Sequence, residues 1–455
     1  MKSSTAAAIS TANAPGGIGI IRISGDDAVS IAAKVFRPLS GEDLTLSKGY
    51  RAHYGYVYDS GERIDEAVCL IYRAPHSYTG EDVAEINCHG GMYLTRQVLR
   101  CVLAAGAEPA GPGEFTKRAF LNGKKDLAGS ESVMALIGAS GRKAASAALN
   151  TLEGKLSGRI RECCDAIKGV CASLTAWVDY PDEDIDEIGR DEMLAVFEST
   201  ASELDRIITA YDNGKAVTQG VDTVIAGRPN VGKSTVMNML TGYDRSIVTD
   251  IAGTTRDVVE ERITLGDIVL NLADTAGIRE TLNTVESIGV EVAKKRLDRA
   301  ELLLAVFDGS SPLNAEDEMI IKLCEGKKSI ALINKSDLGC VIDKSELESS
   351  FDRVINISAL KGEGINELED AIAGVFAANE FDPSLACLTC ERQRNCCVKA
   401  KQSLDEAITS LRAGVTLDAV NVCADCAVDA MLELTGEKAT AAVIDEVFSR
   451  FCVGK

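Results

Sequence analysis

The chain has 455 residues, with 48 Lys and Arg against 69 Asp and Glu, a net charge of −21 and 46% hydrophobic residues. Its length predicts about three domains of ordinary size, and its composition is typical of a globular rather than a disordered protein. The acidic excess argues against a protein that coats nucleic acid through bulk charge, since neutralising phosphates needs clustered Lys and Arg, but it leaves room for a local basic patch.

Cysteine usage and apolar runs indicate the compartment. The 15 cysteines are odd in number and include the adjacent pairs 163–164 and 396–397, which would pair irregularly in an oxidising compartment. The N-terminus lacks the pattern of a signal peptide, and no apolar run approaches the roughly 20 residues of a membrane-spanning helix. We therefore expect a reduced, cytoplasmic protein with no membrane partner.

Residues 1–120 are predicted to be rich in strands with interspersed helices. Strands are expected at Ile18–Ser24 and Glu66–Tyr72. This segment holds 12 basic and 13 acidic residues, so it is nearly neutral, unlike the rest of the chain. We expect it to form one α/β domain.

Residues 121–216 change to a helical pattern. Leu152, Leu156 and Ile160 recur every four residues, and a second apolar stripe runs from Ile167 to Trp177. Pro181 is expected to interrupt the helices, and Asn213-Gly214 predicts a turn.

Residues 217–378 alternate short apolar strands with helical stretches, which is typical of a mostly parallel sheet. The expected strands are Val221–Ala226, Ile268–Leu272, Leu302–Phe307, Ile330–Ile333 and Val354–Ile357. The pattern turns helical again over residues 379–455. The sequence thus predicts a multidomain α+β protein, in which a Ras-like block is inserted between two parts of one helical domain.

A phosphate-binding motif follows the strand Val221–Ala226. The sequence GRPNVGKS occupies Gly227–Ser234 and precedes a predicted helix. Backbone N–H groups of such a loop wrap phosphates, Lys233 reaches the outer phosphates, and the Ser234 hydroxyl binds Mg²⁺.

Three further motifs indicate GTP. DTAG at Asp274–Gly277 would contact Mg²⁺ and the γ-phosphate, and NKSD at Asn334–Asp337 would read the base. The Asp337 carboxylate accepts two hydrogen bonds that guanine donates and adenine does not, which selects GTP over ATP. The third motif, Ser358–Leu360, places a backbone amide near guanine O6. The predicted GTP-binding residues are Asn230, Val231, Gly232, Lys233, Ser234, Thr235, Thr249, Asp250, Ile251, Ala252, Gly253, Thr254, Thr255, Asp274, Thr275, Ala276, Gly277, Asn334, Lys335, Asp337, Ser358, Ala359 and Leu360.

The hydrolytic machinery departs from the Ras pattern. Ile278 stands where Ras-type proteins have the Gln that orients water, and Pro229 crowds the space for an external arginine finger. Thr255 is the expected second Mg²⁺ ligand. Asn230 and the oxygens of residues 249–254 are candidates for holding a monovalent cation beside the phosphates, with an ordinary mobile switch loop as the alternative.

These motifs, together with GIIRISG at Gly19–Gly25, SYTGED at Ser77–Asp82 and the terminal FCVGK at Phe451–Lys455, resemble the tRNA uridine modification GTPase family (MnmE, also called TrmE). The resemblance implies a homodimer with an N-terminal tetrahydrofolate-binding and dimerisation domain, and a potassium-dependent G domain. It also implies an FAD-dependent partner of the MnmG/GidA type. Together the two proteins would add an aminomethyl or carboxymethylaminomethyl group to C5 of wobble uridine 34 in certain tRNAs, using 5-formyl- or methylene-tetrahydrofolate.

The resemblance also implies roles for individual residues. The folate-binding positions are Arg22, Glu81, Lys124 and Lys455; the potassium ligands are Asn230, Thr249, Ile251 and Thr254; the magnesium ligands are Ser234 and Thr255; the catalytic residues are Glu286 and Cys452. Cys452 as a participant in the chemistry and Cys452 as a bystander remain equally open.

Other interpretations of the cysteines, the histidines and the function are also open. The pairs 387/390 and 423/426 form CxxC spacings that suggest zinc, but small buried cysteines in helices are the favoured interpretation. Structural roles are favoured for the three histidines. A ribosome-assembly GTPase of the Era/EngA type, or a folate-dependent transferase with an incidental GTPase, are the alternative functions.

Overall fold

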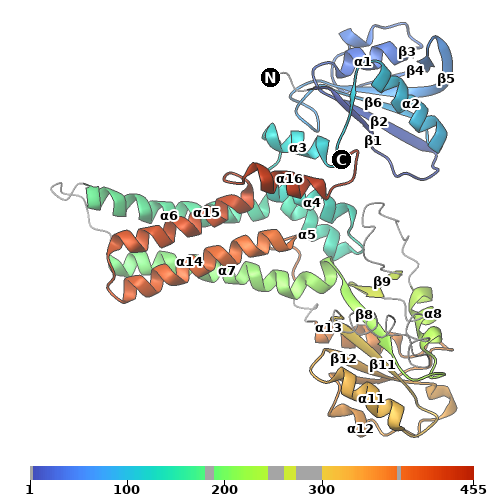
Figure 1. The fold of residues 1–455 in the computed structure, drawn as a ribbon, viewed down its shortest axis with the longest axis vertical. Helices are drawn as coiled ribbons and strands as arrows, with labels where there is room; N and C mark the ends of the chain where they lie inside the picture. The colour runs from blue at the N-terminus through green and yellow to red at the C-terminus, as the bar shows by residue number, and fades with distance from the viewer. Residues whose placement is uncertain (1–3, 180–188, 244–260, 273–299, 377–380) are drawn as a thin grey trace, which may run out of the picture.

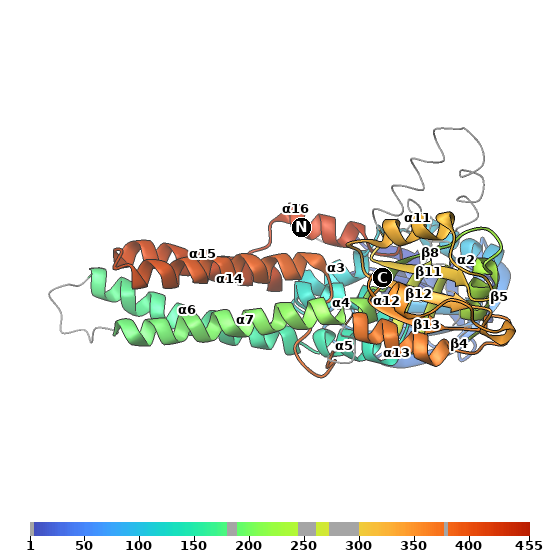
Figure 2. The same cartoon turned by 90° about the horizontal axis from the view of Figure 1, so that it is seen from below.

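The computed structural model describes residues 4–179, 189–243, 261–272, 300–376 and 381–455. Figure 1 shows three parts, which are a sheet with helices near the N-terminus, a long helical bundle, and a second sheet with its own helices. In Figures 1 and 2 the bundle projects to one side of both sheets. The expected multidomain α+β class is thus observed, while the boundaries at 120, 216 and 378 stay predictions.

The first sheet has the strand order β3-β4-β5-β6-β2-β1-β7. Its strands are β1 (Ala6–Ile9), β2 (Ile18–Ser24), β3 (Phe36–Pro38), β4 (Arg51–Asp59), β5 (Glu62–Tyr72), β6 (Val83–His89) and β7 (Glu108–Pro109). Both strands expected from the sequence are present, and β2 has the predicted bounds. Helices α1 (Ala28–Val35) and α2 (Met92–Ala104) pack on one face, where Ile21, Ile23 and Ile86 are fully buried.

This sheet corrects the expected α/β organisation of the N-terminal domain. Its pairings are antiparallel except for the short β1–β7 pair, so the domain is α+β. Strands β4 and β5 are joined by Ser60 and Gly61, both at positive φ, as a two-residue hairpin requires. Alternating burial in a sequence reports one buried face of a strand and says nothing of its direction.

The helical bundle draws its helices from both sides of the second sheet. The helices before that sheet are α3 (Glu114–Leu121), α4 (Leu127–Ile137), α5 (Arg142–Leu152), α6 (Lys155–Asp179) and α7 (Arg190–Thr218). The helices after it are α14 (Glu391–Arg412), α15 (Leu417–Thr435) and α16 (Ala441–Ser449). Helices α6, α7, α14 and α15 share one apolar core and lie side by side in both views.

Two sequence expectations in the bundle need correction. The stripe through Leu152 is interrupted, because α5 ends there and Gly154 turns the chain at φ +90 before α6 begins. The predicted turn at Asn213-Gly214 is also absent, because both residues lie within α7. A Cβ on Gly214 would overlap the ring of Phe381, so this glycine serves close packing rather than a turn.

The second sheet has the order β13-β12-β11-β8-β10-β9, and only its β9–β10 pair is antiparallel. Its strands are β8 (Val221–Ala226), β9 (Glu261–Leu265), β10 (Ile268–Leu272), β11 (Leu302–Asp308), β12 (Ser329–Asn334) and β13 (Arg353–Asn356). The helices around it are α8 (Lys233–Tyr243), α11 (Ala315–Cys324), α12 (Ser345–Glu348) and α13 (Ile365–Val375). The five predicted strands are confirmed to within one residue at each end.

All 15 cysteines lie in the described residues and all are free thiols. Among the described helices, none is long and apolar enough to cross a membrane. The ring of His53 contacts Ser47 at 2.8 Å, and His89 pairs with Asp65 at 2.7 Å, in keeping with structural roles for these histidines.

Candidate functional site

The phosphate-binding motif forms the loop between β8 and α8. Asn230 has φ +63 and Gly232 has φ +99, so the loop turns through left-handed conformations that Asn and Gly tolerate best. The Lys233 ammonium donates hydrogen bonds to the carbonyl oxygens of Gly227 and Arg228 at 2.6 and 2.8 Å. The loop thus leads into the N-terminus of α8, where backbone N–H groups bind anions.

Asn334 links this loop to the other predicted nucleotide-binding segments. It is buried at the end of β12, and its side-chain amide donates to the Val231 carbonyl at 2.8 Å. Its side-chain oxygen accepts from the Ala359 backbone N–H at 3.0 Å. One amide side chain therefore joins the phosphate loop, the NKSD motif and the segment after β13.

The side chains around the expected guanine position are also fixed by hydrogen bonds. The Ser358 hydroxyl donates to the Asp337 carboxylate at 2.8 Å, and Lys335 pairs with Asp308 at 2.6 Å. Burial alone would raise the pKa of Asp308, but the hydrogen bonds from Lys335 and Ser310 outweigh it and lower that pKa. Leu360 is 82% exposed at the rim. These segments follow parallel strands at one edge of the sheet, where ligands bind in α/β folds.

Several predicted site residues lie outside the described residues. They are Thr249, Asp250, Ile251, Ala252, Gly253, Thr254, Thr255, Asp274, Thr275, Ala276, Gly277 and Glu286. Their roles remain predictions. Of the expected metal ligands, Ser234 stands exposed in the first turn of α8 and Asn230 is exposed in the loop. Hydroxyl and amide oxygens suit Mg²⁺ and monovalent cations, so these donors fit the expected ions.

A second candidate site lies on the N-terminal domain around Arg22. The Arg22 guanidinium donates to Glu85 at 2.8 Å, and its central carbon lies 5.2 Å from the ring centre of Tyr78 and 5.5 Å from that of Phe115. The Lys124 ammonium donates to the Pro75 carbonyl at 3.2 Å. The structure therefore places Lys124 against the segment that carries Tyr78 and Glu81.

The Glu81 carboxylate is bound by Arg118, which was not among the predicted site residues. It accepts hydrogen bonds from Arg118 at 3.0 Å and Ser24 at 2.8 Å. Arg118 also binds Glu114 at 2.9 Å. Burial would lower the pKa of Arg118, but these two carboxylates outweigh it and raise that pKa. The sequence signal for Arg118 was its spacing of four residues from Glu114, which places the two side chains on one face of a helix.

The C-terminal tail, residues 452–455, packs against the N-terminal domain. The Phe115 N–H donates to the Lys455 carbonyl at 3.1 Å, and the Gly113 N–H donates to the Cys452 carbonyl at 3.3 Å. The Ser10 hydroxyl donates to the Gly454 carbonyl at 2.9 Å. Since the Phe115 ring also contacts Arg22, the tail and the predicted folate residues belong to one neighbourhood.

The cysteine pairs do not form a metal centre. Among the described residues, no group of three or more His, Cys, Asp or Glu side chains is arranged to hold a metal ion. Cys387 and Cys390 precede α14 rather than lying within a helix as expected, and burial raises the pKa of Cys390 to about 12. Cys387 is buried and packs as a small apolar group, whereas Cys426 is exposed.

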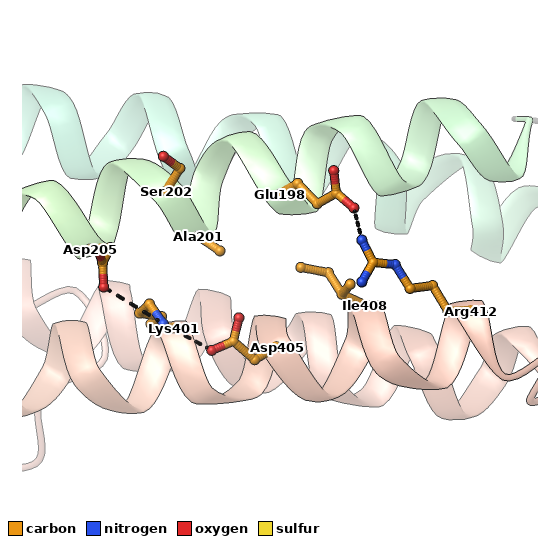
Figure 3. A pocket seen from close by; sticks show the side chains of 8 residues that line it. All are labelled: Glu198, Ala201, Ser202, Asp205, Lys401, Asp405, Ile408 and Arg412. Carbon is orange, nitrogen blue, oxygen red and sulfur yellow. Dashed lines mark hydrogen bonds and ion pairs between the residues drawn. The ribbon is translucent and has the colours of Figure 1, made fainter.

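An open groove lies between α7 and α14, away from both candidate sites. Figure 3 shows Ala201 and Ile408 facing each other across it, with ion pairs at both ends. Arg412 pairs with Glu198 at 2.6 Å, and Lys401 contacts Asp405 at 3.1 Å. The groove is lined by three carboxylates and two cations, and none of the predicted site residues lines it.

Comparison with known proteins identifies the family. The family model of the MnmE helical domain matches residues 127–452, and that of the N-terminus of the GTP-binding protein TrmE matches residues 5–124. The tRNA modification GTPase MnmE of Lactobacillus acidophilus is 42% identical over 455 residues, covering 99% of this chain and 98% of that protein. MnmE of Thermoanaerobacter pseudethanolicus is 40% identical over 456 residues, covering 99% of each.

The chain belongs to the MnmE family of tRNA modification GTPases. A solved G domain of the FeoB iron transporter of T. maritima is 27% identical, and the match covers 34% of this chain and 98% of that one. The TM-score of this match is 0.27.

The phosphate loop of this MnmE-family chain yields a first prediction. A Cβ at Gly232 would overlap the Asn334 amide, and the φ of +99 is strained for any L side chain. Gly232→Ala should weaken binding of a fluorescent GDP analogue by about tenfold or more. Gly242→Ala, within α8 and with open space around it, is the control and should leave the affinity unchanged. Equal affinities for both variants would contradict this role of Asn334.

The docked tail yields a second prediction. Gly454 has φ +94, and a Cβ there would overlap the Ile9 carbonyl. Gly454→Ala should therefore displace the tail and speed hydrogen exchange at the Phe115 amide, which donates to Lys455. Gly141→Ala, where a Cβ meets nothing, should leave that amide protected. Unchanged Phe115 protection in Gly454→Ala would mean that the tail is not held by these contacts.

Proposed function

We propose that this chain is a potassium-dependent GTPase that modifies tRNA together with an FAD-dependent partner of the MnmG/GidA type. The pair adds an aminomethyl or carboxymethylaminomethyl group to C5 of wobble uridine 34, using a one-carbon unit from tetrahydrofolate. The GTPase part of the proposal rests on the two hydrogen bonds of Asn334. Its side chain bonds the phosphate loop and the segment after β13 at the same time. Family membership carries the tRNA half.

GTP is the proposed nucleotide because of Asp337. Its carboxylate accepts from Ser358, which fixes it at the sheet edge where a base would lie. Guanine offers two donors to such a carboxylate, whereas adenine would leave it unpaired. Mg²⁺ would be held by Ser234 and Thr255.

Potassium is proposed as the source of positive charge during hydrolysis. Asn230 is exposed in the left-handed turn of the loop, so its side-chain oxygen is available to a cation. Thr249, Ile251 and Thr254 would supply further oxygens, and Glu286 would orient the attacking water. A cation beside the phosphates stabilises charge that develops on the transferred group, as an arginine finger does elsewhere.

The folate half of the proposal concerns the surface around Arg22. Arg22, Glu81, Lys124 and Lys455 would bind 5-formyl- or methylene-tetrahydrofolate, and the docked tail supports this grouping. Residues 1–120 would form the folate-binding and dimerisation domain of a homodimer. Residues 121–216 and 379–455 would form the helical domain, with the G domain at 217–378.

The charge distribution suits a partner-assisted encounter with tRNA in the cytoplasm. A net charge of −21 opposes binding of a large polyanion by this chain alone. We therefore assign much of the basic tRNA-binding surface to the FAD-dependent partner. The alternative of a ribosome-assembly GTPase is not retained, because both family models belong to the tRNA modification family.

The cation proposal predicts a salt-specific GTPase. The rate of GTP hydrolysis by the full chain should be on the order of tenfold to a hundredfold higher in KCl than in NaCl of equal ionic strength. Lys233→Ala should be inactive in both salts, which excludes a contaminating GTPase. Equal rates in the two salts would contradict the proposed potassium dependence.

The modification proposal predicts a nucleoside phenotype. Cells that lack the gene should lose the modified wobble uridine in mass spectra of digested tRNA, and the wild-type gene should restore it. Cys452→Ser should restore little modification if its thiol takes part, whereas Cys340→Ser, an exposed cysteine of the G domain, should restore it fully. Failure of the wild-type gene to restore it would refute the function, and full restoration by Cys452→Ser would refute only the role of the thiol.

A further inference from the structure

Tyr78 lies at the centre of a small group of cations on the N-terminal domain. Its hydroxyl bonds the hydroxyl of Thr116 in α3 at 2.9 Å, which anchors the ring to that helix. The central carbon of the Arg22 guanidinium lies 5.2 Å from the ring centre, and the Lys125 ammonium lies 5.8 Å from it. Both cations are therefore within reach of one ligand of folate size.

The cations around Tyr78 differ in their hydrogen-bond and ion-pair partners. Arg22 is neutralised by Glu85 at 2.8 Å, and Lys124 donates to the Pro75 carbonyl at 3.2 Å. Among the described residues, Lys125 forms no hydrogen bond or ion pair; its ammonium lies over the Tyr78 ring, and the adjacent Asp126 carboxylate acts on it only through its charge. The adjacent Asp126 is engaged elsewhere, since its carboxylate accepts from the Gly129 N–H at 2.7 Å and caps α4.

Lys125 is also partly withdrawn from water. Burial lowers the pKa of its ammonium, and although the Asp126 carboxylate opposes this shift, the charge of Lys124 adds to it. A desolvated cation without a hydrogen-bonded carboxylate is unfavourable, and a cation–π contact recovers only part of the lost hydration. An arriving anion would supply the missing partner.

We propose that Lys125 binds an anionic group of the ligand held around Arg22 and Lys124, and that it makes the site prefer a folate carrying several glutamate carboxylates. This inference rests on the folate binding proposed above and adds a specificity residue to it. Lys125 follows Lys124 directly, so it extends the cationic surface beyond the positions assigned by family resemblance. A monoglutamate offers few carboxylates, whereas each added glutamate brings another.

The test is a binding titration of the full chain with 5-formyltetrahydrofolate as the monoglutamate and as the pentaglutamate, at physiological salt. The wild type should bind the pentaglutamate roughly threefold to tenfold more tightly. Lys125→Met should lose this preference with little change in monoglutamate affinity, and Lys125→Arg should keep it. Lys34→Met is the matched control, because it removes the same charge from α1, where Lys34 donates to the Ala105 carbonyl.

The outcomes separate this inference from the proposed function. If the wild type and Lys125→Met show the same preference, the specificity role of Lys125 is wrong while folate binding stands. If Lys34→Met loses the preference as fully as Lys125→Met, the effect is one of net charge and the proposal is overturned. If the wild type binds neither folate, the proposed folate site is refuted and the inference with it.

Discussion

The architecture depends on one apolar core that is shared by helices from distant parts of the sequence. Residues such as Leu156 and Phe197 precede the second sheet, whereas Leu404 and Met431 follow it, yet all are buried together. Apolar burial of this kind is worth about 25 cal/mol per Å² removed from water. Because the bundle closes only when both segments are present, the G domain is held at two points of the chain.

Polar contacts join helices within the bundle and also link the bundle to the second sheet. Arg392, at the start of α14, forms a paired interaction with Glu131 at 2.6 and 2.8 Å and also binds the Leu434 carbonyl at 3.0 Å. On the other side, Lys143 pairs with Asp267 at 3.0 Å and Lys215 with Glu301 at 2.9 Å. These last two pairs link the helices to the second sheet. The C-terminal tail follows α16. Its Lys455 carbonyl accepts a hydrogen bond from the N–H of Phe115, whose ring lies beside Arg22.

Local signals predicted the strands and the nucleotide motifs well, since both are encoded by contiguous residues. The bounds of β8 and β10 follow from apolar runs alone, and the Gly227–Ser234 loop carries its own glycines and lysine. The errors came from features that depend on distant partners. The Asn213-Gly214 dipeptide predicted a turn, but this glycine is needed for close packing against Phe381, which lies 167 positions away in the sequence. The direction of the N-terminal strands likewise depends on which strands pair, and the burial pattern of one strand does not report that. The switch residues and Glu286 lie outside the described residues, so their assignments stay predictions.

The sequence by itself determined the family and the GTPase motifs, because motifs and periodicity are properties of neighbouring residues. Only the tertiary structure decided what each charged side chain faces. It paired Arg118 with Glu81, joined Asn334 to two loops at once, and placed Lys125 against the Tyr78 ring with no hydrogen-bonded carboxylate among the described residues. Such pairings arise when segments far apart in the chain bury a common surface, and a charge that loses water there must find a partner whose position no local pattern records.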